Sequence, residues 1–473
     1  MNEKTPILVG SAQYVDRDFV NTRSMSPIDI SSQVSQMALL DASTSESFKQ
    51  TVDVLISARL FEDSVKGTPL WPNPFGGPDN VPGAVARRIG LNPQRLVYAE
   101  VGGETPQRVV NQMAEQIFSG HVRSVVFTGS EALATIRTAQ KNGLEFDWTE
   151  KVGRDFEDLW PKNPMSDEYE AKHGITFPIQ VYALLEQARR HRLGLSLRDY
   201  RERIAGLLSP FSAIAENNPY AQFPKYLAKE YIANFSEQNF PLCEPYTKWM
   251  VAQDAVNQGA AVIMTSVATA IEYGIPKSQW IYLKSYSDCD ELRVVERSDL
   301  SRSPAQQLAL KSALDNSGLI PRDLSLIDLY SCFPIAIWTA CESLGLATDG
   351  TPPLTVTGGL PYFGGPGNNY SLHAIAEVVQ RLRGRQDKYA LVAANGGYLS
   401  KHSVGVYGSD LNEEWKPCDQ PSTLNLERSP VRVKEKASGC GIIESYAAVY
   451  SRGERKKGFI VGRLVEGEQR FLA

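Results

Sequence analysis

Apolar runs of strand length alternate with segments of helical periodicity along the first part of the chain. Residues 5–13 (TPILVGSAQ) and 52–58 (VDVLISA) are short, nearly continuous apolar runs, which predict buried strands. Residues 27–43 and 106–118 instead carry apolar residues at helical spacing. The same alternation predicts a helix over 81–89 and strands over 96–101 and 122–130. A βαβα order of this kind is typical of a mostly parallel sheet covered by helices.

The pattern changes at about residue 143 and resumes near Gly259. Residues 143–250 are rich in Tyr, Phe, Pro, Arg and Glu, and two amphipathic pieces, LLEQARRHRLGL and LRDYRERIAGLL, predict a mostly helical insertion. We find no convincing strand pattern within it. A long insertion in an α/β protein usually covers or shapes a binding site.

Strands and helices alternate again after the insertion. The apolar runs predict strands over residues 259–266, 280–286, 324–329, 389–393 and 403–407. Helices are predicted over residues 303–317, 336–344 and 368–383. Ser303 and Pro304 suit the cap and the first turn of the first of these helices. The order of the first half therefore recurs, which suggests a structural duplication.

The last segment of the chain differs from both halves. Residues 408–429 are polar and predict a linker. Residues 431–473 hold short β-type runs (VRVKEK, GIIESYAAVYS and GFIVGRLVEGEQRFLA), which predict a small β-rich appendage. Because its apolar content is marginal for independent stability, we expect it to pack on the main body.

Composition and charge narrow the class of protein. The 473 residues are 42% hydrophobic and 22% charged, as in ordinary globular proteins, and the length suggests about two to four structural units. A net charge of −5 lacks the basic footprint of a nucleic-acid-binding protein. Six cysteines without a CxxC pair favour reduced thiols over a zinc ribbon or a disulfide framework. Since neither a secretory leader nor a long apolar span is found, we expect a cytoplasmic protein.

Three glycine-rich segments are candidates for a functional site. Residues 101–107 (VGGETPQ) open a helix, where backbone amides favour an oxyanion, although a tight strand-to-helix turn has the same pattern. Residues 358–370 (GGLPYFGGPGNNY) allow close backbone approach to a ligand or form a helix-entry loop, and fit neither a dinucleotide fingerprint nor a P-loop. Residues 394–402 (ANGGYLSKH) offer the polar groups of Asn395 and of His402, which is either functional or structural.

A fourth segment, residues 329–334 (LYSCFP), places polar side chains at the end of a buried strand. Open α/β sheets bind their ligands at the carboxyl ends of strands, so Tyr330 and Cys332 are candidates. Cys332 can serve as a nucleophile or as an acid/base if its pKa is lowered. The alternative is that Cys332 is a small core residue.

Taken in this order, the four segments resemble the thiolase superfamily. They are closest to type-1 thiolase-like proteins, relatives of the sterol-carrier-protein-type thiolases. The strings GGLPYFGGPGNNYSLHAI and NGGYLSKH carry the resemblance most specifically, and GAAVIMTSVATAIEYGIP is similar to the close of a thiolase N-terminal half. The resemblance covers about residues 5–407.

The resemblance implies an α/β thiolase fold. In that fold, two similar βαβαβαββ halves stack in five layers (αβαβα), with a helical loop domain inserted in the first half. The halves would be residues 1–265, including the insertion at 143–250, and residues 266–407. Residues 408–473 resemble an additional C-terminal domain.

Transferring the catalytic residues of thiolases to this chain mostly fails. The acyl-accepting cysteine corresponds to Gly102 or Gly103, and the histidine of the family's GHP motif corresponds to Gly365. The cysteine of the CxG motif corresponds to Asn395, which cannot exchange a proton near neutral pH. Only Cys332 matches, at a position where the sterol-carrier-protein type has an acid/base cysteine. Ordinary thiolysis is therefore not expected.

The expected function is that of a thiolase-like acyl-CoA-binding protein of the acetyl-CoA acetyltransferase family without the usual nucleophile. The alternatives are non-covalent, retro-aldol-type cleavage of a C–C bond in an acyl-CoA, and non-catalytic binding of acyl-CoA or lipid. A conventional thiolase with Cys332 as its nucleophile is less favoured. The resemblance implies lipid metabolism, coenzyme A as substrate or ligand, and no permanent cofactor or metal.

The candidate residues divide into two groups. The catalytic candidates are Tyr330, Cys332, Asn395 and His402, and the candidates for binding the thioester of coenzyme A are Gly364, Gly365, Gly367 and Asn368. Thiolases are usually oligomers, although a monomer stays open for this type. The C-terminal domain is a candidate surface for a protein partner.

Overall fold

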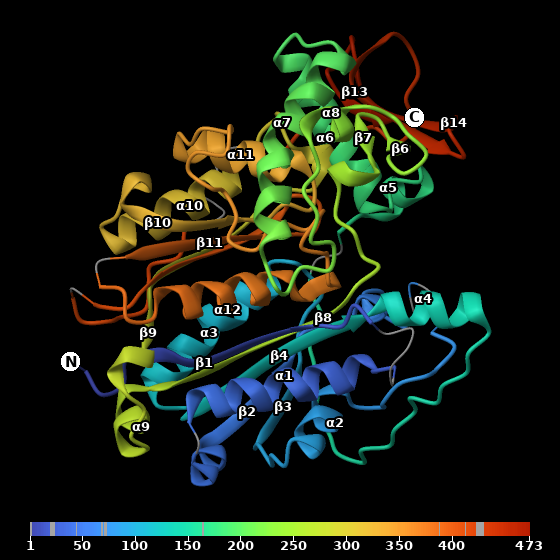
Figure 1. Ribbon diagram of the computed structural model, residues 1–473. Coiled ribbons are helices and arrows are strands. Elements are labelled where there is room, and N and C mark those ends of the chain that lie inside the picture. The colour runs from blue at the N-terminus through green and yellow to red at the C-terminus, as the bar shows by residue number, and fades with distance from the viewer. Residues whose placement is uncertain are drawn as a thin grey trace.

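Two sheet layers alternate with three helix layers in the main body (Figure 1). The structure, a computed structural model, describes residues 2–18, 24–43, 45–67, 70, 73–162, 165–386, 388–411, 413–421 and 430–473. One sheet layer contains β1 (Pro6–Val15), β2 (Val52–Ser57), β3 (Arg95–Tyr98), β4 (Ser124–Ala132) and β8 (Asn257–Ser266). The other contains β9 (Ile281–Asp290), β10 (Leu324–Leu329), β11 (Tyr389–Gly396) and β12 (Lys401–Gly408). This five-layer α/β architecture is the one that the resemblance to thiolases implies.

Hydrogen bonding runs continuously through both sheet layers. The strand order is β10-β11-β12-β9-β1-β8-β4-β2-β3-β5, in which β5 (Glu157–Asp158) comes from the insertion. The layers join where β9 pairs with β1 over Ile7↔Tyr282 and Leu8↔Ile281. Strands β2, β3 and β4 are parallel, as are β10 and β11, so their carboxyl ends lie at a common edge of each layer.

The helices occupy three layers. Helices α3 (Thr105–Ser119) and α12 (Tyr370–Leu382) lie between the sheets, as Figure 1 shows. The outer faces are covered by α1 (Pro27–Ala42) and α2 (Val81–Arg88) on one side and by α10 (Pro304–Ser317) and α11 (Pro334–Leu344) on the other. Leu8 packs with α3 and α12, whereas Ile7 and Val9 pack with α1. Because both faces of the strand are covered, its sequence is continuously apolar rather than alternating.

The insertion is mostly helical, as expected, but it also contains strands. It begins directly after α4 (Leu133–Asn142), and its helices are α5 (Glu168–Lys172), α6 (Pro178–Arg192), α7 (Leu197–Glu216) and α8 (Lys229–Ala233). The absence of strands was predicted wrongly, since β5, β6 (Pro241–Cys243) and β7 (Tyr246–Thr247) lie within it. These strands are two or three residues long, too short to produce a recognisable alternation.

The C-terminal segment forms a second, smaller sheet with the insertion. Its strands are β13 (Gly441–Ser451), β14 (Glu454–Leu464) and β15 (Arg470–Leu472), in the order β15-β14-β13-β6-β7. Strand β13 pairs with β6 at Val449↔Cys243, and Ser445 Oγ donates to Leu184 O of α6 at 2.5 Å. The expected β-rich appendage therefore exists and packs on the body, and the insertion completes its sheet.

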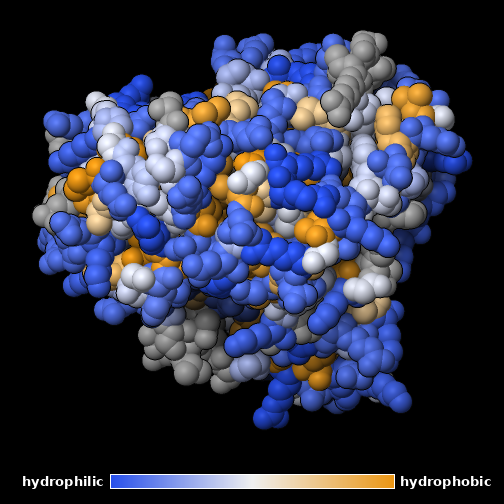
Figure 2. All heavy atoms as spheres, turned by 90° about the horizontal axis from the view of Figure 1, so that it is seen from below, coloured by the Kyte–Doolittle hydropathy of each residue, from blue (hydrophilic) through white to orange (hydrophobic). Residues whose placement is uncertain are grey.

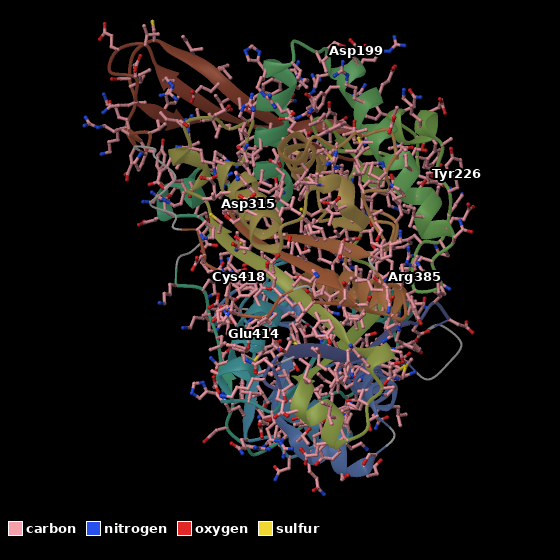
Figure 3. All side chains as sticks on the ribbon, turned by 90° about the vertical axis from the view of Figure 1, so that its left-hand side faces the viewer. Asp199, Tyr226, Asp315, Arg385, Glu414 and Cys418 are labelled. Carbon is pink, nitrogen blue, oxygen red and sulfur yellow. The ribbon has the colours of Figure 1, made fainter. Side chains whose placement is uncertain are left out.

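The predicted linker is held along the body over much of its length. Trp415 Nε1 donates to Leu283 O at 2.6 Å, and Gln420 Oε1 accepts from Asp288 N at 2.7 Å, so residues 413–421 run beside β9. Glu414 and Cys418 mark this segment in Figure 3. Residues 422–429 of the predicted linker lie outside the described residues.

The face that includes α1 is mainly hydrophilic. Figure 2 shows hydrophobic residues there in small, separate groups. Leu40 on α1 is 60% exposed, and Ile271 on α9 (Val267–Glu272) is 61% exposed. Scattered exposed apolar residues of this kind are ordinary on a folded protein. In the part of the chain that the structure describes, no helix has both the length and the apolar character that a bilayer crossing needs.

Candidate active site

Three segments that are distant in the sequence meet where β10 and β11 end. Tyr330 and Cys332 follow β10, Asn395 lies at the end of β11, and Gly103 precedes α3. Asn395 Nδ2 lies 3.7 Å from Cys332 Sγ, and the Tyr330 N–H donates to Ala393 O at 3.0 Å. The parallel pairing of β10 and β11 brings these side chains together at the carboxyl edge of the sheet. Three of the four predicted catalytic residues are therefore neighbours.

The phenol of Tyr330 occupies the space beside the turn that precedes α3. A β-carbon at Gly103 would come within 2.1 Å of Tyr330 Oη and 2.6 Å of Asn395 O. No side chain fits there unless both Tyr330 and the backbone at Asn395 move. Burial raises the pKa of Tyr330 well above its usual value, so the hydroxyl stays protonated at neutral pH.

Glu104, the first residue after this turn, is a carboxyl group that the sequence reasoning passed over. It is 1% exposed, and its Oε1 lies 3.9 Å from Lys401 Nζ. Oε2 has no hydrogen-bond partner among the described residues and lies so close to Gly396 that a β-carbon there would be 1.6 Å away. Burial raises the pKa of Glu104, and the charges of Arg108 and Lys401 oppose that rise.

Cys332 is a poor nucleophile in this environment. Burial raises the pKa of its thiol to about 12. A reactive cysteine needs the opposite shift, because the thiolate is the nucleophile. The backbone carbonyl of Cys332 accepts from Ala252 N at 3.0 Å, which fixes the segment in place.

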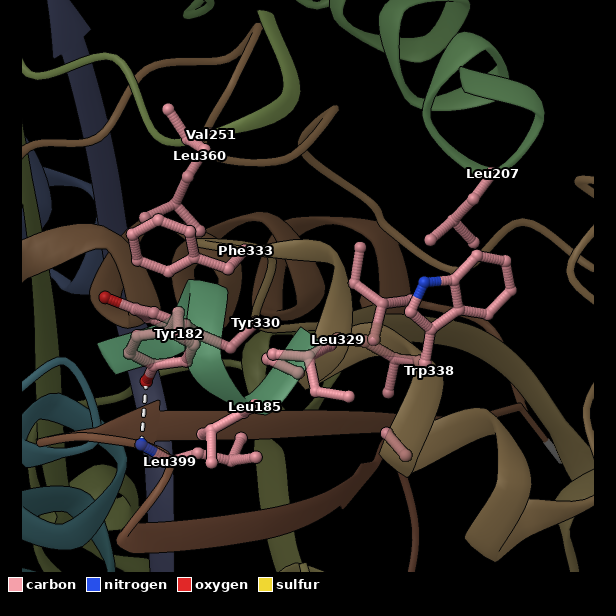
Figure 4. Packing of buried hydrophobic residues seen from close by; sticks show 14 of the residues in the cluster. Tyr182, Leu185, Leu207, Val251, Leu329, Tyr330, Phe333, Trp338, Leu360 and Leu399 are labelled. Carbon is pink, nitrogen blue, oxygen red and sulfur yellow. Dashed lines mark hydrogen bonds between the residues drawn. The ribbon is translucent and has the colours of Figure 1, made fainter. Parts of the chain in front are cut away.

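Tyr182 of α6 reaches into this group from the insertion. Its hydroxyl accepts from Asn395 Nδ2 at 2.8 Å and from Leu399 N at 2.9 Å, the bond drawn in Figure 4, and it donates to Gly397 O at 3.2 Å. Its ring stacks on Phe333 with centroids 4.3 Å apart. Sequence reasoning missed Tyr182, because the sequence of a helical insertion does not show which helix face contacts a strand end more than 200 residues away. The only sequence feature that indicated a buried helix face here was the group of apolar residues that follows in LLEQARRHRLGL.

His402 pairs with Asn395 in the β11–β12 ladder, but its imidazole faces α10. Its Nε2 lies 3.1 Å from the hydroxyl oxygen of Ser303, the residue that caps that helix. Burial, and then the charge of Arg297, lower the pKa of His402 to about 3. The imidazole is therefore neutral at physiological pH, and its polar contact is structural.

Two backbone amides of the glycine-rich loop before α12 are already hydrogen-bonded within the protein. The Gly365 N–H donates to Gln253 O at 2.7 Å, and the Gly367 N–H donates to Gly365 O at 2.8 Å. Gly364 has a φ of 121°, in the region that favours glycine, and a β-carbon there would lie 2.4 Å from Gln258 Oε1. The loop thus packs closely on β8 and on the segment before it.

Asn368 connects that loop to the turn before α3. Its Oδ1 accepts from Gly102 N at 3.0 Å, and its Nδ2 donates to Arg59 O at 3.0 Å. Asn368 is 6% exposed. Of the four residues predicted to bind coenzyme A, this one fixes the geometry of the Gly102–Gly103 turn.

Metal ligation is not indicated by the geometry. Within the described ranges, no group of three or more His, Cys, Asp or Glu side chains is arranged to hold a metal ion. The polar groups that meet at this site are one carboxyl, one thiol, one amide and two phenols, contributed by Glu104, Cys332, Asn395, Tyr182 and Tyr330.

The five layers and the position of these segments define a thiolase-fold protein. Human mitochondrial 3-ketoacyl-CoA thiolase has the same fold, with a TM-score of 0.60 at 15% identity over 86% of this chain and 100% of that one. More particularly, the chain belongs to the SCP2-thiolase-like proteins of type 1. The crystal structure of a monomeric protein of this type from Mycobacterium smegmatis matches with a TM-score of 0.84 and 35% identity, covering 100% of this chain and 92% of that one.

Two further comparisons support this assignment. The family model of the thiolase-like protein type 1 additional C-terminal domain matches residues 420–473. An acetyl-CoA acetyltransferase from Methanothermobacter thermautotrophicus is 28% identical over 261 residues, which cover 51% of this chain. The match spans 63% of that relative, less than two thirds of its length.

Proposed function

We propose that this protein binds an acyl-CoA thioester and forms no acyl-enzyme. The observation that carries the proposal is the Tyr330 hydroxyl, which lies where a side chain at Gly103 would have to be. The acyl-CoA ligand is supported by the thiolase fold and by the acetyl-CoA acetyltransferase relative. The expected place in lipid metabolism follows from that ligand.

The energetics argue against covalent acyl transfer. A thiol with a pKa of about 12 is deprotonated in only about one molecule in 10⁵ at pH 7. Removing one oxyanion donor typically costs about 3–4 kcal/mol of transition-state stabilisation, and Gly365 supplies no side-chain donor. Thiolysis would therefore lack both its nucleophile and part of its oxyanion stabilisation.

Two measurements on the full chain test this proposal. Calorimetric titration with acetyl-CoA should show saturable binding, and the Cys332→Ala variant should bind equally well. Mass spectrometry after incubation with acetyl-CoA should find Cys332 unmodified. An acetylated Cys332 peptide would restore the conventional thiolase mechanism, and an absence of binding would contradict the acyl-CoA assignment.

A second candidate, retro-aldol cleavage, is favoured by the buried carboxyl of Glu104. Its Oε2 is unpartnered among the described residues, and burial raises the pKa of Glu104, which makes the carboxylate a stronger proton acceptor. In this reaction the carboxylate takes the proton of a 3-hydroxyl group, the bond between C2 and C3 breaks, and a carbonyl product leaves. The thioester enolate that remains is then protonated at C2, with Tyr330 or Cys332 as the nearby acid.

Binding without catalysis and retro-aldol cleavage are distinguished by whether the protein converts its ligand to products. If cleavage occurs, 3-hydroxyacyl-CoA substrates should yield an aldehyde or ketone, and Glu104→Gln should reduce the rate by about 10²–10⁴-fold. Glu186→Gln, which alters a buried carboxyl of α6 in the insertion, is the control and should retain turnover. If none of the substrates is cleaved, the retro-aldol candidate is eliminated, and acyl-CoA binding without catalysis is the remaining proposal.

A further inference from the structure

The C-terminal segment binds the short stretch of backbone that follows β9. Its residue Arg470, the first of β15, is 1% exposed. Arg470 Nη1 donates to Val295 O at 2.9 Å and to Arg297 O at 2.6 Å. Between these two carbonyls, Glu296 O accepts from Val431 N at 2.9 Å. Three successive carbonyl groups therefore bond to the C-terminal segment, and because buried carbonyls are unfavourable without a partner, these bonds fix the stretch in place.

Arg470 is itself oriented by a carboxylate. Its Nε donates to Glu444 Oε2 of β13 at 2.7 Å, as part of an ion pair. Arg463 of β14 binds the other oxygen, Glu444 Oε1, at 2.7 Å and donates to Glu468 O at 3.0 Å. Two arginines thus share one carboxylate. Arg470 extends from it to the main body, whereas Arg463 extends to the turn that follows β14.

Arg297 continues these contacts to the turn between β11 and β12, residues 397–400. It is buried, and its Nη2 donates to Tyr398 O at 2.9 Å. Burial lowers the pKa of Arg297, and the charges of Glu291 and Glu170 oppose that change. The guanidinium therefore stays charged and holds the carbonyl of the turn with a charge-assisted hydrogen bond.

The turn is strained and belongs to the candidate active site. Buried Leu399 has a φ of 53°, in the left-handed region that side-chain-bearing residues rarely adopt. Such a conformation persists only where the surrounding contacts impose it. The Leu399 N–H donates to the Tyr182 hydroxyl, which in turn donates to Gly397 O and accepts from Asn395 Nδ2. A shift of the turn would therefore displace this network.

Two further contacts hold the same turn. The Tyr398 hydroxyl donates to Thr176 O of the insertion at 2.8 Å, and Glu291 N donates to Ser400 O at 2.7 Å. The insertion and the segment after β9 thus share the task of holding the turn. The contribution of that segment through Arg297 depends on a backbone that the C-terminal segment fixes.

We propose that Arg470 is a positioning residue for the acyl-CoA site, acting through Arg297 on the turn between β11 and β12. The inference rests on the proposed acyl-CoA-binding function, because it assigns Arg470 a role at that same site. It gives the C-terminal segment a part in ligand binding, beyond its packing against the insertion. Loss of the Arg470 guanidinium loosens the turn and with it the hydrogen bonds of Tyr182 to Asn395.

Hydrogen–deuterium exchange of the full chain, read by mass spectrometry, measures the turn directly. Arg470→Met should raise exchange by about fivefold in a peptide that covers residues 397–400, with little change over β10. Arg463→Met is the matched control, because it also removes a partner of Glu444 and leaves the bonds of Arg470 to the main body intact. Its exchange over residues 397–400 should equal that of the parent chain. A role confined to the C-terminal sheet would raise exchange in that sheet alone and would contradict the inference.

Calorimetric titration with acetyl-CoA measures the effect on the site. Arg470→Met should weaken binding by about threefold or more, whereas Arg463→Met should bind as the parent chain does. Arg470→Lys keeps a cation beside Glu444 if Arg470→Met does not fold. Because an ammonium lacks the planar fork that spans Glu444 and both carbonyls, this variant should show the same two changes at smaller size.

Two results overturn the inference. One is unchanged exchange over residues 397–400 in the Arg470 variants, and the other is unchanged acetyl-CoA affinity in those variants when the parent chain binds acetyl-CoA. If the parent chain does not bind acetyl-CoA, the proposed function fails, whereas the exchange measurement still shows whether Arg470 positions the turn.

Discussion

Buried side chains fill the space beside the turn that precedes α3. Tyr330, which follows β10, lies beside Gly103, whereas Tyr182 of α6 binds Asn395, and both tyrosines are buried. Asn395 Nδ2 donates to the hydroxyl of Tyr182, so this amide is part of a hydrogen-bonded network. Buried polar groups of this kind are stable only when partnered, which fixes their orientation.

The close approach of Tyr330 to Gly103 gives a direct prediction. Gly103→Ala should destabilise the fold by about 1–3 kcal/mol, because the new methyl group overlaps the phenol. Tyr330→Ala should relieve the overlap with the phenol but not the close contact with Asn395 O, so the double variant should be partly rescued and less affected than the sum of the two single variants. Thermal or denaturant unfolding measures the difference.

Gly77→Ala is the matched control for this cycle, since no atom lies within 4 Å of a β-carbon at that position. It should change the free energy of unfolding by less than about 0.5 kcal/mol. Strict additivity of Gly103→Ala and Tyr330→Ala would show that the two residues do not overlap.

Sequence reasoning found part of this site and missed the rest for a physical reason. Tyr330, Cys332 and Asn395 follow buried parallel strands, and strand ends converge, so their proximity was predictable. Tyr182 and the role of Glu104 depend on how a helix from the insertion and a buried carboxyl are placed in three dimensions. The periodicity of apolar residues does not show where the Tyr182 side chain or the Glu104 carboxyl lies in the folded protein.

At the scale of elements, the insertion is anchored through one buried carboxyl. Glu186 of α6 accepts from Tyr200 of α7 at 2.5 Å, from Tyr246 of β7 at 2.8 Å and from the Ile335 N–H of α11 at 2.8 Å. Four elements therefore meet at one side chain. Figure 4 shows the neighbouring core, in which Leu207 lies near Trp338.

This anchor predicts a pH dependence of stability. Burial raises the pKa of Glu186 from 4.5 to about 7, so the folded chain binds its proton more tightly than the unfolded chain does. The stabilisation is complete below about pH 4.5 and is lost as the pH rises through 7, by about 3 kcal/mol in total. Melting temperatures between pH 5 and 8 should therefore fall with pH.

The Glu186→Gln variant isolates this contribution from other titrating groups. Glutamine can still accept through its carbonyl oxygen but does not titrate, so the fall in melting temperature should be shallower than in the parent chain. Glu46→Gln, at an exposed surface position, should retain the parent slope. Identical slopes in all three proteins would show that Glu186 does not titrate in this range.

The helices and long strands of the main body agree with the sequence to within a few residues. Strand β10 has the predicted bounds, residues 324–329, and α10 begins after the predicted cap at Ser303. Apolar periodicity and caps determine such elements locally. The strands β5, β6 and β7 exist only through their partners in β3 and β13, so local sequence could not reveal them.

At the scale of the whole molecule, the C-terminal sheet and the insertion share one hydrophobic core. Phe459 and Val461 of β14 belong to the same buried cluster as Val181 and Leu184 of α6 and as the residues of α11. We propose that the chain divides into three units at about residues 265 and 407. Strands of the first unit, residues 1–265, complete the sheet of the third unit, residues 408–473. The two sheets should therefore unfold together.

Phe459→Ala tests this shared core. The side chain is 2% exposed, and its truncation should destabilise the chain by about 3–5 kcal/mol while leaving a single unfolding transition. Ile442→Ala, at a position that is 65% exposed on the neighbouring strand, should have little effect. A separate early transition in calorimetry of Phe459→Ala would show that the C-terminal sheet unfolds independently.

The pairing of β6 with β13 also constrains when the protein can finish folding during its synthesis. Glu244, directly after β6, binds Tyr450 and Arg455, and Tyr450 is 206 residues further along the chain. On a ribosome that adds roughly 5–20 residues per second, β6 would wait about 10–40 seconds for its partner. During that interval its edge and the apolar face of α6 are open to other nascent chains. The insertion is thus the segment that a molecular chaperone has most reason to shield.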